Sequence, residues 1–468
     1  MGDPSGFVGP PVESASDAPC LERLAGTCTS AGGAAVEVPW EVALRAPVQG
    51  RPERSQGRLE AIWGIDWGTK VLAVCAVDEE GKRLFEEEIT RSGDAIERMV
   101  RRVLAEAEGD PSQVFVALEL PRASVIEAFL ARGAHVFSIN PKQVDRFRDR
   151  HTVAGAKDDA LDAYVLADAL RTDRKLFRAL EPEEEALVIL RERSRACDDL
   201  TRQVKATASQ IQAVLQRYYP ELAGLGRWHE EPWLWALFEL APTPQKLRKL
   251  HPKKVERHLE KSRIQRKGVH QSLQRARETK PLPTSKAVTK ACAERIQRLL
   301  PILRAAHHER RQCQSDLRQL VHELASVEED DEPSDMAILL SFPGIGYRVA
   351  AVLRAEAWMA IGDRDSQALR RLSGTAPVSK RSGGRSKRPQ VSMRRACHTR
   401  ISNAVRYWAS VAIQHDDRAA ALYQACRARG HNYSRALRTV ADRLLPVLIA
   451  ALRNRTLYRP QLRRHSVA

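Results

Sequence analysis

The chain has 468 residues, of which 76 are Lys or Arg and 59 are Asp or Glu, so its formal net charge is +17. This excess of positive charge favours a polyanionic partner such as nucleic acid, and the length allows two or three domains. A secreted or membrane-spanning protein is not expected, because the sequence has no secretion signal, no run of 18 apolar residues and no metal-type spacing among its eight cysteines.

Residues 1–57 are rich in Gly, Pro, Ala and Ser and show little periodicity, which predicts a disordered extension. The run from Ala61 to Val77 then predicts a strand, a tight glycine turn and a second strand, since β-branched and aromatic residues dominate it. Asp66 stands at the end of the first of these strands. A buried strand that ends in a carboxylate is a candidate site.

Two more short apolar runs predict strands. Val114 to Leu118 is too short for a helix and is followed by Glu119, and His135 to Ile139 is closed by Asn-Pro. A helical pattern begins at Asp159. On that helix Asp159 and Asp162 lie about 60° apart, in the same half of the wheel as the apolar residues; these are Val165, Leu166, Ala169 and Leu170.

The order of these elements predicts that four acids converge: Asp66, Glu119, Asp159 and Asp162. Close carboxylates repel one another by roughly 4 kcal/mol per pair at ~4 Å and an effective dielectric of ~20, so such a cluster normally holds divalent cations. The set would suit two-metal phosphodiester chemistry on nucleic acid. The alternative interpretation is a group of unrelated solvated acids.

Long helical patterns follow. A 3-4 spacing of apolar and small residues from Glu183 to about Tyr218 predicts a coiled-coil helix, and a second such stretch follows Pro301, interrupted by Arg310. Between them, Lys246 to Lys267 carries ten basic residues. Either a solvated helical face or phosphate contact would explain that charge.

The segment SFPGIGYRVAAV places the turn Pro343-Gly344-Ile345-Gly346 between two apolar helical segments. Such a hairpin can present backbone N–H groups and a helix N-terminus to a phosphate. A purely structural helix-turn-helix is the alternative.

A basic loop comes next, because no acid occurs between Asp365 and Asp416. The loop carries Ser382 immediately before Gly383, with other serines nearby. It leads into a helix whose predicted apolar stripe is Ile401, Ala404, Val405, Trp408 and Ala412.

Taken together, the motifs carry a resemblance. Over about residues 60–460, the order GIDWGTK, VALELP, SINPKQVDRF, AKDDALDAYVLADAL, SFPGIGYRVAAVLRAE, LRRLSGTAP, KRSGGRSKR and RALRTVADRLLPVLIAALRNRTLY resembles the DEDD insertion-sequence transposases. These are bacterial recombinases, related to the Piv invertase, with a RuvC-like domain and a serine-bearing C-terminal domain.

The resemblance implies roles for particular residues. The four acids would hold Mg²⁺, as two ions, with Mn²⁺ as an alternative, and Ser382 would form a covalent link to DNA. A serine needs activation and nothing in KRSGGR supplies a base, so metal held by the acids of the other domain would activate it. The expected nucleic-acid contacts are Pro343, Gly344, Gly346, Arg381, Gly383, Arg385, Lys387 and Arg388.

The predicted fold is α/β plus α, with an RNase H-like (RuvC-like) domain, a long coiled-coil middle and a mostly helical C-terminal domain containing a helix-hairpin-helix. The predicted boundaries are an N-terminal extension at 1–57, the RNase H-like domain at 58–180, the helical linker with its basic insert at 181–330, the C-terminal transposase domain at 331–460 and a tail at 461–468.

The implied partners are donor and target DNA and a non-coding guide RNA, in a homo-oligomer (dimer or tetramer) of the bacterial cytoplasm and nucleoid, without a membrane. Asp158 fits the motif less well than Asp159, and Pro446 is expected to kink the last helix. Rival classes are a RuvC-type junction nuclease, a non-catalytic transposase descendant, and an actin-like kinase, for which the second phosphate loop is not found.

Overall fold

The computed structural model describes residues 62–68, 70–107, 110–119, 124–151, 158–177, 179–182, 184–264, 267–326, 332–380 and 390–459. The expected N-terminal extension at 1–57 and the serine loop residues 381–389 lie outside this part of the chain.

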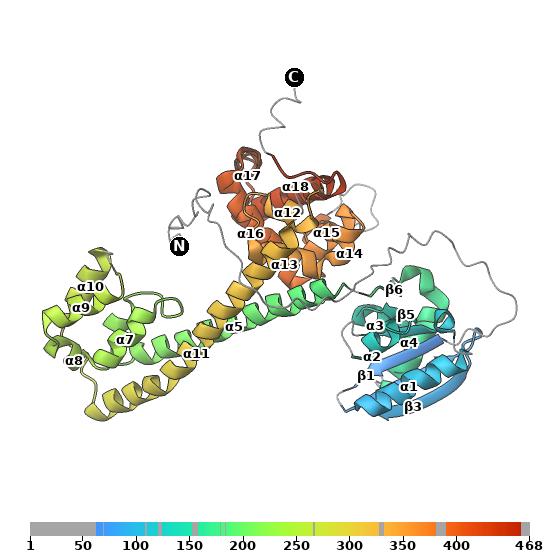
Figure 1. Cartoon of the computed structure of the whole chain (residues 1–468), viewed down its shortest axis with the longest axis horizontal. Coiled ribbons are helices and arrows are strands. Elements are labelled where there is room, and N and C mark those ends of the chain that lie inside the picture. The colour runs from blue at the N-terminus through green and yellow to red at the C-terminus, as the bar shows by residue number, and fades with distance from the viewer. Residues whose placement is uncertain are drawn as a thin grey trace, which may run out of the picture. The chain divides into compact units, whose positions relative to one another are not determined.

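The first region is built on a mixed six-stranded sheet with the order β3-β2-β1-β4-β5-β6 (Figure 1). Its strands are β1 (Ile62–Trp67), β2 (Val71–Val77), β3 (Arg83–Thr90), β4 (Phe115–Leu118), β5 (His135–Ser138) and β6 (Ala179–Leu180). The central strand β1 pairs antiparallel with β2 and parallel with β4. The four predicted strands are therefore present. The edge strand β3 was not predicted, because its run of three glutamates has little apolar alternation.

Helices cover both faces of this sheet. They are α1 (Gly93–Glu106), α2 (Ser124–Leu130), α3 (Pro141–Arg148) and α4 (Asp159–Asp173), with 3-10 turns at Pro111–Gln113 and Arg174–Leu176. On one face, Trp63 and Ile65 of β1 pack with α1 and α2, and on the other, Ile62 packs with α4. A mixed sheet between helical layers is consistent with the expected RNase H-like α/β domain.

The next region is dominated by two long helices, α5 (Glu185–Gln216) and α11 (Lys286–Ala325), which pack along one another (Figure 1). Helix α11 begins well before Pro301, where the sequence pattern had placed its start. Pro301 lies inside this helix at an exposed position and leaves one carbonyl of the preceding turn without its helical donor.

Shorter helices join the ends of this pair: α6 (Pro220–Ala223), α7 (Pro232–Leu240), α8 (Pro244–Lys249), α9 (Pro252–Lys261) and α10 (Lys267–Glu278). Trp228, Trp233 and Trp235 lie in their core. The predicted basic segment folds as α8 and α9, with Val255 and Leu259 buried and its described cations exposed. That exposure is compatible with both interpretations of the charge.

The last region is mostly helical, with α12 (Asp335–Leu340), α13 (Tyr347–Glu356), α14 (Trp358–Gly362), α15 (Ser366–Ser373), α16 (Thr399–His415), α17 (Asp417–Ala428), α18 (Tyr433–Arg453) and the paired strands β7 (Val378–Lys380) and β8 (Gln390–Ser392). All five residues of the stripe predicted on α16 are buried. Helix α18 continues through Pro446, which is exposed. None of the described helices is long and apolar enough to cross a membrane.

Candidate active site

The acids Asp66 and Glu119 are placed by neighbouring parallel strands. Asp66 is the fifth residue of β1, and Glu119 directly follows β4. Because Ile65 is registered with Leu118, Asp66 and Glu119 follow at the same level and at the same edge of the sheet. Asp66 is 9% exposed, so the fold holds its carboxylate close to the core.

The other two acids lie in the first turn of α4, which crosses β1 at an unusually short distance. A Cβ at Gly64 would lie 1.9 Å from the carbonyl oxygen of Ala163, so only glycine allows this approach. Directly after β1, which ends at Trp67, a Cβ at Gly68 would lie 3.4 Å from Oδ2 of Asp159. The N-terminus of α4 is thereby brought to the edge where β1 ends.

Asp162 is the most deeply buried of the four acids, with 1% of its surface exposed. Its Oδ1 accepts a hydrogen bond from Nε of Arg148 on α3 at 2.5 Å, and this bond raises the pKa of the Arg148 guanidinium. Its Oδ2 is buried and has no hydrogen-bond partner among the described residues. A buried carboxylate oxygen without a partner is costly unless a cation completes it.

Asp158 has a different role from Asp159. It is the N-cap of α4, and its side chain accepts from the backbone N–H of Ala160 at 3.4 Å. Asp158 is exposed, whereas Asp159 is partly buried and lies near Gly68. The structure therefore gives a physical reason for the preference for Asp159 over Asp158 in the acid set.

In the described part of the chain, no three His, Cys, Asp or Glu residues stand close enough together to hold a metal ion. The predicted convergence of the four acids on one metal site is therefore not confirmed: Asp66 and Glu119 share a sheet edge and Asp159 lies near Gly68, whereas Asp162 is paired with Arg148. The donor set fits a hard divalent cation, since carboxylate oxygens are its preferred ligands and Asp162 has an unpartnered one.

A further buried acid, Asp168 on α4, was not singled out in the sequence. Arg171 donates to its Oδ1 from Nη2 at 2.6 Å, and His151 contacts its Oδ2 at 3.2 Å. Arg171 also binds the carbonyl of Glu79 at 3.0 Å, so this group ties α4 to the turn after β2. We therefore assign Asp168 a structural role.

The predicted phosphate hairpin lies between α12 and α13, and its residues differ in surroundings. The carbonyl of Pro343 accepts from Nε1 of Trp408 at 3.1 Å. Gly344 has φ +89°, and a Cβ there would lie 3.0 Å from Val411 on α16, so packing explains this glycine. Gly346 is exposed, with open space beside it, and caps α13.

Ser382, Gly383 and the basic residues Arg381, Arg385, Lys387 and Arg388 lie outside the described residues. The strands on either side of them pair, with Lys380 opposite Gln390.

Two further side chains were not predicted as site residues from the sequence. Arg148 follows the quoted motif SINPKQVDRF directly, and Arg310, which interrupts an apolar pattern on α11, lines a cavity described below.

The mixed sheet between helical layers, with acids at two of its strand ends, is consistent with the class of RNase H-like α/β domains. Comparison with known families identifies the family. A model of the DEDD transposases of IS110 type matches residues 63–220, and a second, described as the transposase IS116/IS110/IS902 family, matches residues 336–424.

Curated relatives agree with these matches. The chain is 35% identical over 285 residues to a putative transposase, y4uE, of Sinorhizobium fredii, which covers 56% of this chain and 77% of the relative. It is 30% identical over 427 residues to the mini-circle putative transposase for IS117 of Streptomyces coelicolor, covering 85% of this chain and 95% of the relative. An uncharacterized IS110 protein of the same organism is 26% identical over 411 residues, covering 85% and 95%.

The chain belongs to the IS110-type family of DEDD insertion-sequence transposases. Membership implies DNA substrates, an activity that cleaves or transfers DNA strands, and use of a divalent metal.

Proposed function

We propose that this transposase exchanges DNA strands through a covalent serine intermediate, at a site where Asp66, Glu119, Asp159 and Asp162 hold two Mg²⁺ ions. The observation that carries the proposal is the buried, unpartnered Oδ2 of Asp162 in the first turn of α4, the helix that packs closely against β1. When bound, the metal supplies charge stabilisation of the phosphoryl oxygens and activation of the attacking oxygen.

The chain's own residues would act as follows. Oγ of Ser382 attacks phosphorus, so that an O–P bond to serine forms and the P–O bond to one deoxyribose breaks. The serine proton leaves to solvent or a carboxylate, and the departing sugar oxygen takes up a proton to become a hydroxyl. Attack by a sugar hydroxyl on the serine phosphodiester reverses this step and joins the new strand.

Arg381 and Arg385 flank Ser382 in sequence and would balance the charge of the phosphate. The remaining proposed contacts, Gly383, Lys387 and Arg388, would bind the backbone on either side. Pro343, Gly344 and Gly346 would contribute the hairpin, for which the exposure of Gly346 at the start of α13 is the support.

The domain plan belongs to the same proposal: an RNase H-like domain at 58–180, a coiled-coil linker at 181–330 and a C-terminal domain with a helix-hairpin-helix at 331–460. The packing of α5 against α11 supports the coiled coil. An active site that takes residues from two domains can also take them from two protomers, which would favour a dimer or tetramer. A guide RNA rests on the family resemblance and on the chain's net charge of +17.

The test is a search for a protein–DNA adduct that survives denaturation. Purified chain, Mg²⁺, element RNA and end-labelled donor DNA are incubated and then separated in denaturing gels. Wild type should give an adduct, and Ser382→Ala should give none, while Ser386→Ala, the matched control in the same loop, should retain it. Adduct at the wild-type level from Ser382→Ala would reject the serine assignment.

Omitting one component at a time tests the remaining partners. Without Mg²⁺, or with Asp66→Asn, the adduct should disappear. Without RNA the amount of adduct should fall, because the proposed guide RNA is then missing. DNA cleavage that needs Asp66 but neither Ser382 nor RNA would favour a RuvC-type nuclease.

A further inference from the structure

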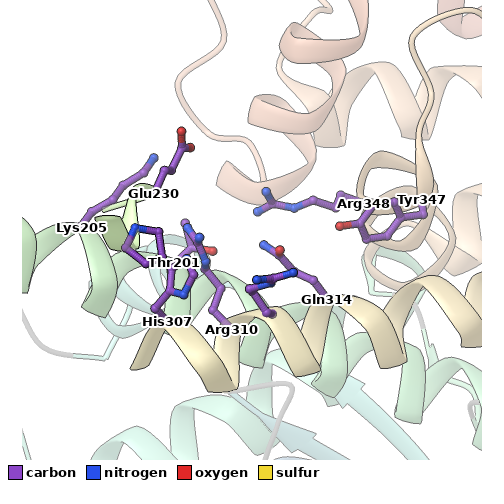
Figure 2. A pocket seen from close by; sticks show the side chains of 10 residues that line it. Thr201, Lys205, Glu230, His307, Arg310, Gln314, Tyr347 and Arg348 are labelled. Carbon is purple, nitrogen blue, oxygen red and sulfur yellow. The ribbon is translucent and has the colours of Figure 1, made fainter. Parts of the chain in front are cut away.

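A cavity of about 500 Å³ lies beside the start of α13, lined also by α5, α11 and the turn before α7 (Figure 2). Its charged lining comprises Lys205, Glu230, Arg310, Arg311 and Arg348. Glu230, the one acid of this lining, forms an ion pair with Arg227 at 3.0 Å, and Arg348 pairs with Asp198, outside the lining, at 3.2 Å. The lining cations therefore outnumber their acids, and the cavity is positively charged.

Arg310 carries the clearest sign of a missing partner. Its Nε is buried and has no hydrogen-bond partner among the described residues, and it forms no ion pair with a described acid. Burial lowers its pKa, and although Glu230 acts to raise it, the charges of Arg348 and Arg311 lower it further. A partly buried cation among like charges is costly unless an anion joins it.

His307 is a second, independent sign. It lies one turn before Arg310 on α11, lines the cavity and is only 8% exposed. Its ring packs edge-on against Trp235, with 5.1 Å between ring centroids, yet none of the described residues forms a hydrogen bond with its nitrogens. Burial lowers its pKa, as do Arg310 and Arg311, so the ring is neutral at pH 7 and can donate one N–H.

The start of α13 adds backbone donors. Tyr347 and Arg348 are its first two residues, and both line the cavity. The first N–H groups of a helix have no intrahelical acceptor, and the cap Gly346 has no side chain to supply one. Figure 2 shows the Arg348 and Tyr347 side chains on the α13 side of the cavity and Arg310 and His307 on the α11 side.

We propose that this cavity binds a phosphodiester group of a nucleic-acid strand, held by Arg310, Arg348 and His307 together with the N-terminus of α13. Guanidinium forks, a neutral imidazole N–H and free helix N–H groups match the tetrahedral oxygens of phosphate. The choice of nucleic acid over another polyanion rests on the proposed function. Contacts of this kind fix a backbone and do not read its sequence.

The first test measures affinity in the full chain with labelled duplex DNA and with single-stranded RNA, over a series of salt concentrations. Arg310→Met keeps the length of the side chain and removes its charge. It should weaken binding by roughly tenfold and reduce the salt slope by about one. A loss with DNA, with RNA or with both identifies the strand that occupies the cavity.

The matched control is Arg298→Met, which removes an exposed cation from the same helix outside the cavity. It should weaken binding less than Arg310→Met. Equal losses in the two variants would overturn the proposal, because a diffuse charge effect would then suffice.

Thermal unfolding separates binding from structure. Without anion, Arg310→Met should be at least as heat-stable as wild type, since it removes an unpaired cation; inorganic pyrophosphate should raise the Tm of wild type more than that of the variant. A large drop in Tm with unchanged nucleic-acid affinity would assign Arg310 a structural role and overturn the site.

Strand cleavage distinguishes this site from the proposed catalytic function. Affinity that depends on Arg310 in a wild-type chain that forms no adduct would reject the catalytic proposal and retain the cavity. Adduct formation with affinity indifferent to Arg310 would retain the catalytic proposal and reject the cavity.

Discussion

Arg148 on α3 donates a hydrogen bond from Nε to Oδ1 of Asp162 on α4 at 2.5 Å, while Oδ2 of the same carboxylate has no partner among the described residues. The guanidinium supplies the positive charge that a buried acid needs. It satisfies one oxygen and leaves the other for a cation. The ion pair therefore fixes the Asp162 side chain with its second oxygen uncontacted.

Replacing Arg148 by Met should make the protein depend on metal for stability. Without divalent cations the free energy of unfolding should fall by roughly 3 kcal/mol, because Asp162 is left buried and unpaired. Added Mg²⁺ should then raise the Tm of the variant more than that of wild type. Chemical unfolding in EDTA and in Mg²⁺ measures both effects.

Arg150→Met is the matched control. Arg150 is exposed and pairs with Asp173 at 3.7 Å, so its loss should cost less than about 1 kcal/mol. Wild-type stability of Arg148→Met in EDTA would contradict the expectation.

The neighbours Asp158 and Asp159 offer a sharp comparison of roles. Asp159→Asn should lower strand cleavage by roughly 100-fold or more while DNA binding persists, because it removes a metal-holding charge. Asp158→Asn should keep activity within about threefold, since Asn caps a helix as well as Asp does. Cleavage and gel-shift assays on both variants decide the matter, and equal losses would show that the acid set is assigned wrongly.

The burial of two of the four acids could be predicted because it depends on local pattern. A strand that ends in an acid, and a helix whose acids extend its apolar face, are readable from residue spacing, and Asp66 and Asp162 are indeed buried. The pairing of Arg148 with Asp162 was not readable, because it depends on how α3 packs against α4. Arg310 was visible in the sequence as a charge within an apolar pattern, but its position in the lining of a cavity is known only from the structure.

Glycine at residue 64 is required by the distance between β1 and α4. Gly64→Ala would place a Cβ 1.9 Å from the carbonyl oxygen of Ala163, so α4 must move away from the sheet. We expect a loss of roughly 3 kcal/mol in the free energy of unfolding, together with loss of strand cleavage, because Asp159 and Asp162 move with the helix. Denaturant unfolding and cleavage assays measure the two effects.

Gly93→Ala serves as the control for a glycine substitution. Gly93 opens α1, and a Cβ there would meet nothing within 4 Å, so this change should be neutral or slightly stabilising. If Gly64→Ala were equally harmless, the close approach of α4 to β1 would not position the acids.

Glu356 ties α5, α13 and α16 together. Its carboxylate accepts from Nε and Nη2 of Arg195 at 2.9 Å each and from Nη1 of Arg400, with His398 3.5 Å away. Burial acts to raise the pKa of Glu356, but the hydrogen bond and charge of Arg195 and the charges of Arg400 and His398 outweigh it and lower the pKa to about 2.

A pKa held below its unfolded value of 4.5 gives Glu356 a stabilising effect that is complete above pH 4.5 and is lost as the pH falls toward 2. Glu356→Gln should remove this part of the pH dependence and cost roughly 3 kcal/mol at pH 7, since two arginines lose a buried partner. Urea unfolding at intervals between pH 7 and pH 2.5 tests both expectations.

Glu192→Gln provides the comparison on the same arginine, because Glu192 pairs with Arg195 at 2.9 Å but its side chain is 62% exposed. Solvent screens that pair, so its loss should lower the free energy of unfolding by less than about 1 kcal/mol. The decrease in the free energy of unfolding below pH 4.5 should be the same as in wild type. If the free energy of unfolding fell in parallel for wild type and Glu356→Gln below pH 4.5, Glu356 would not cause this pH dependence. Other buried acids would then cause any loss of stability in acid.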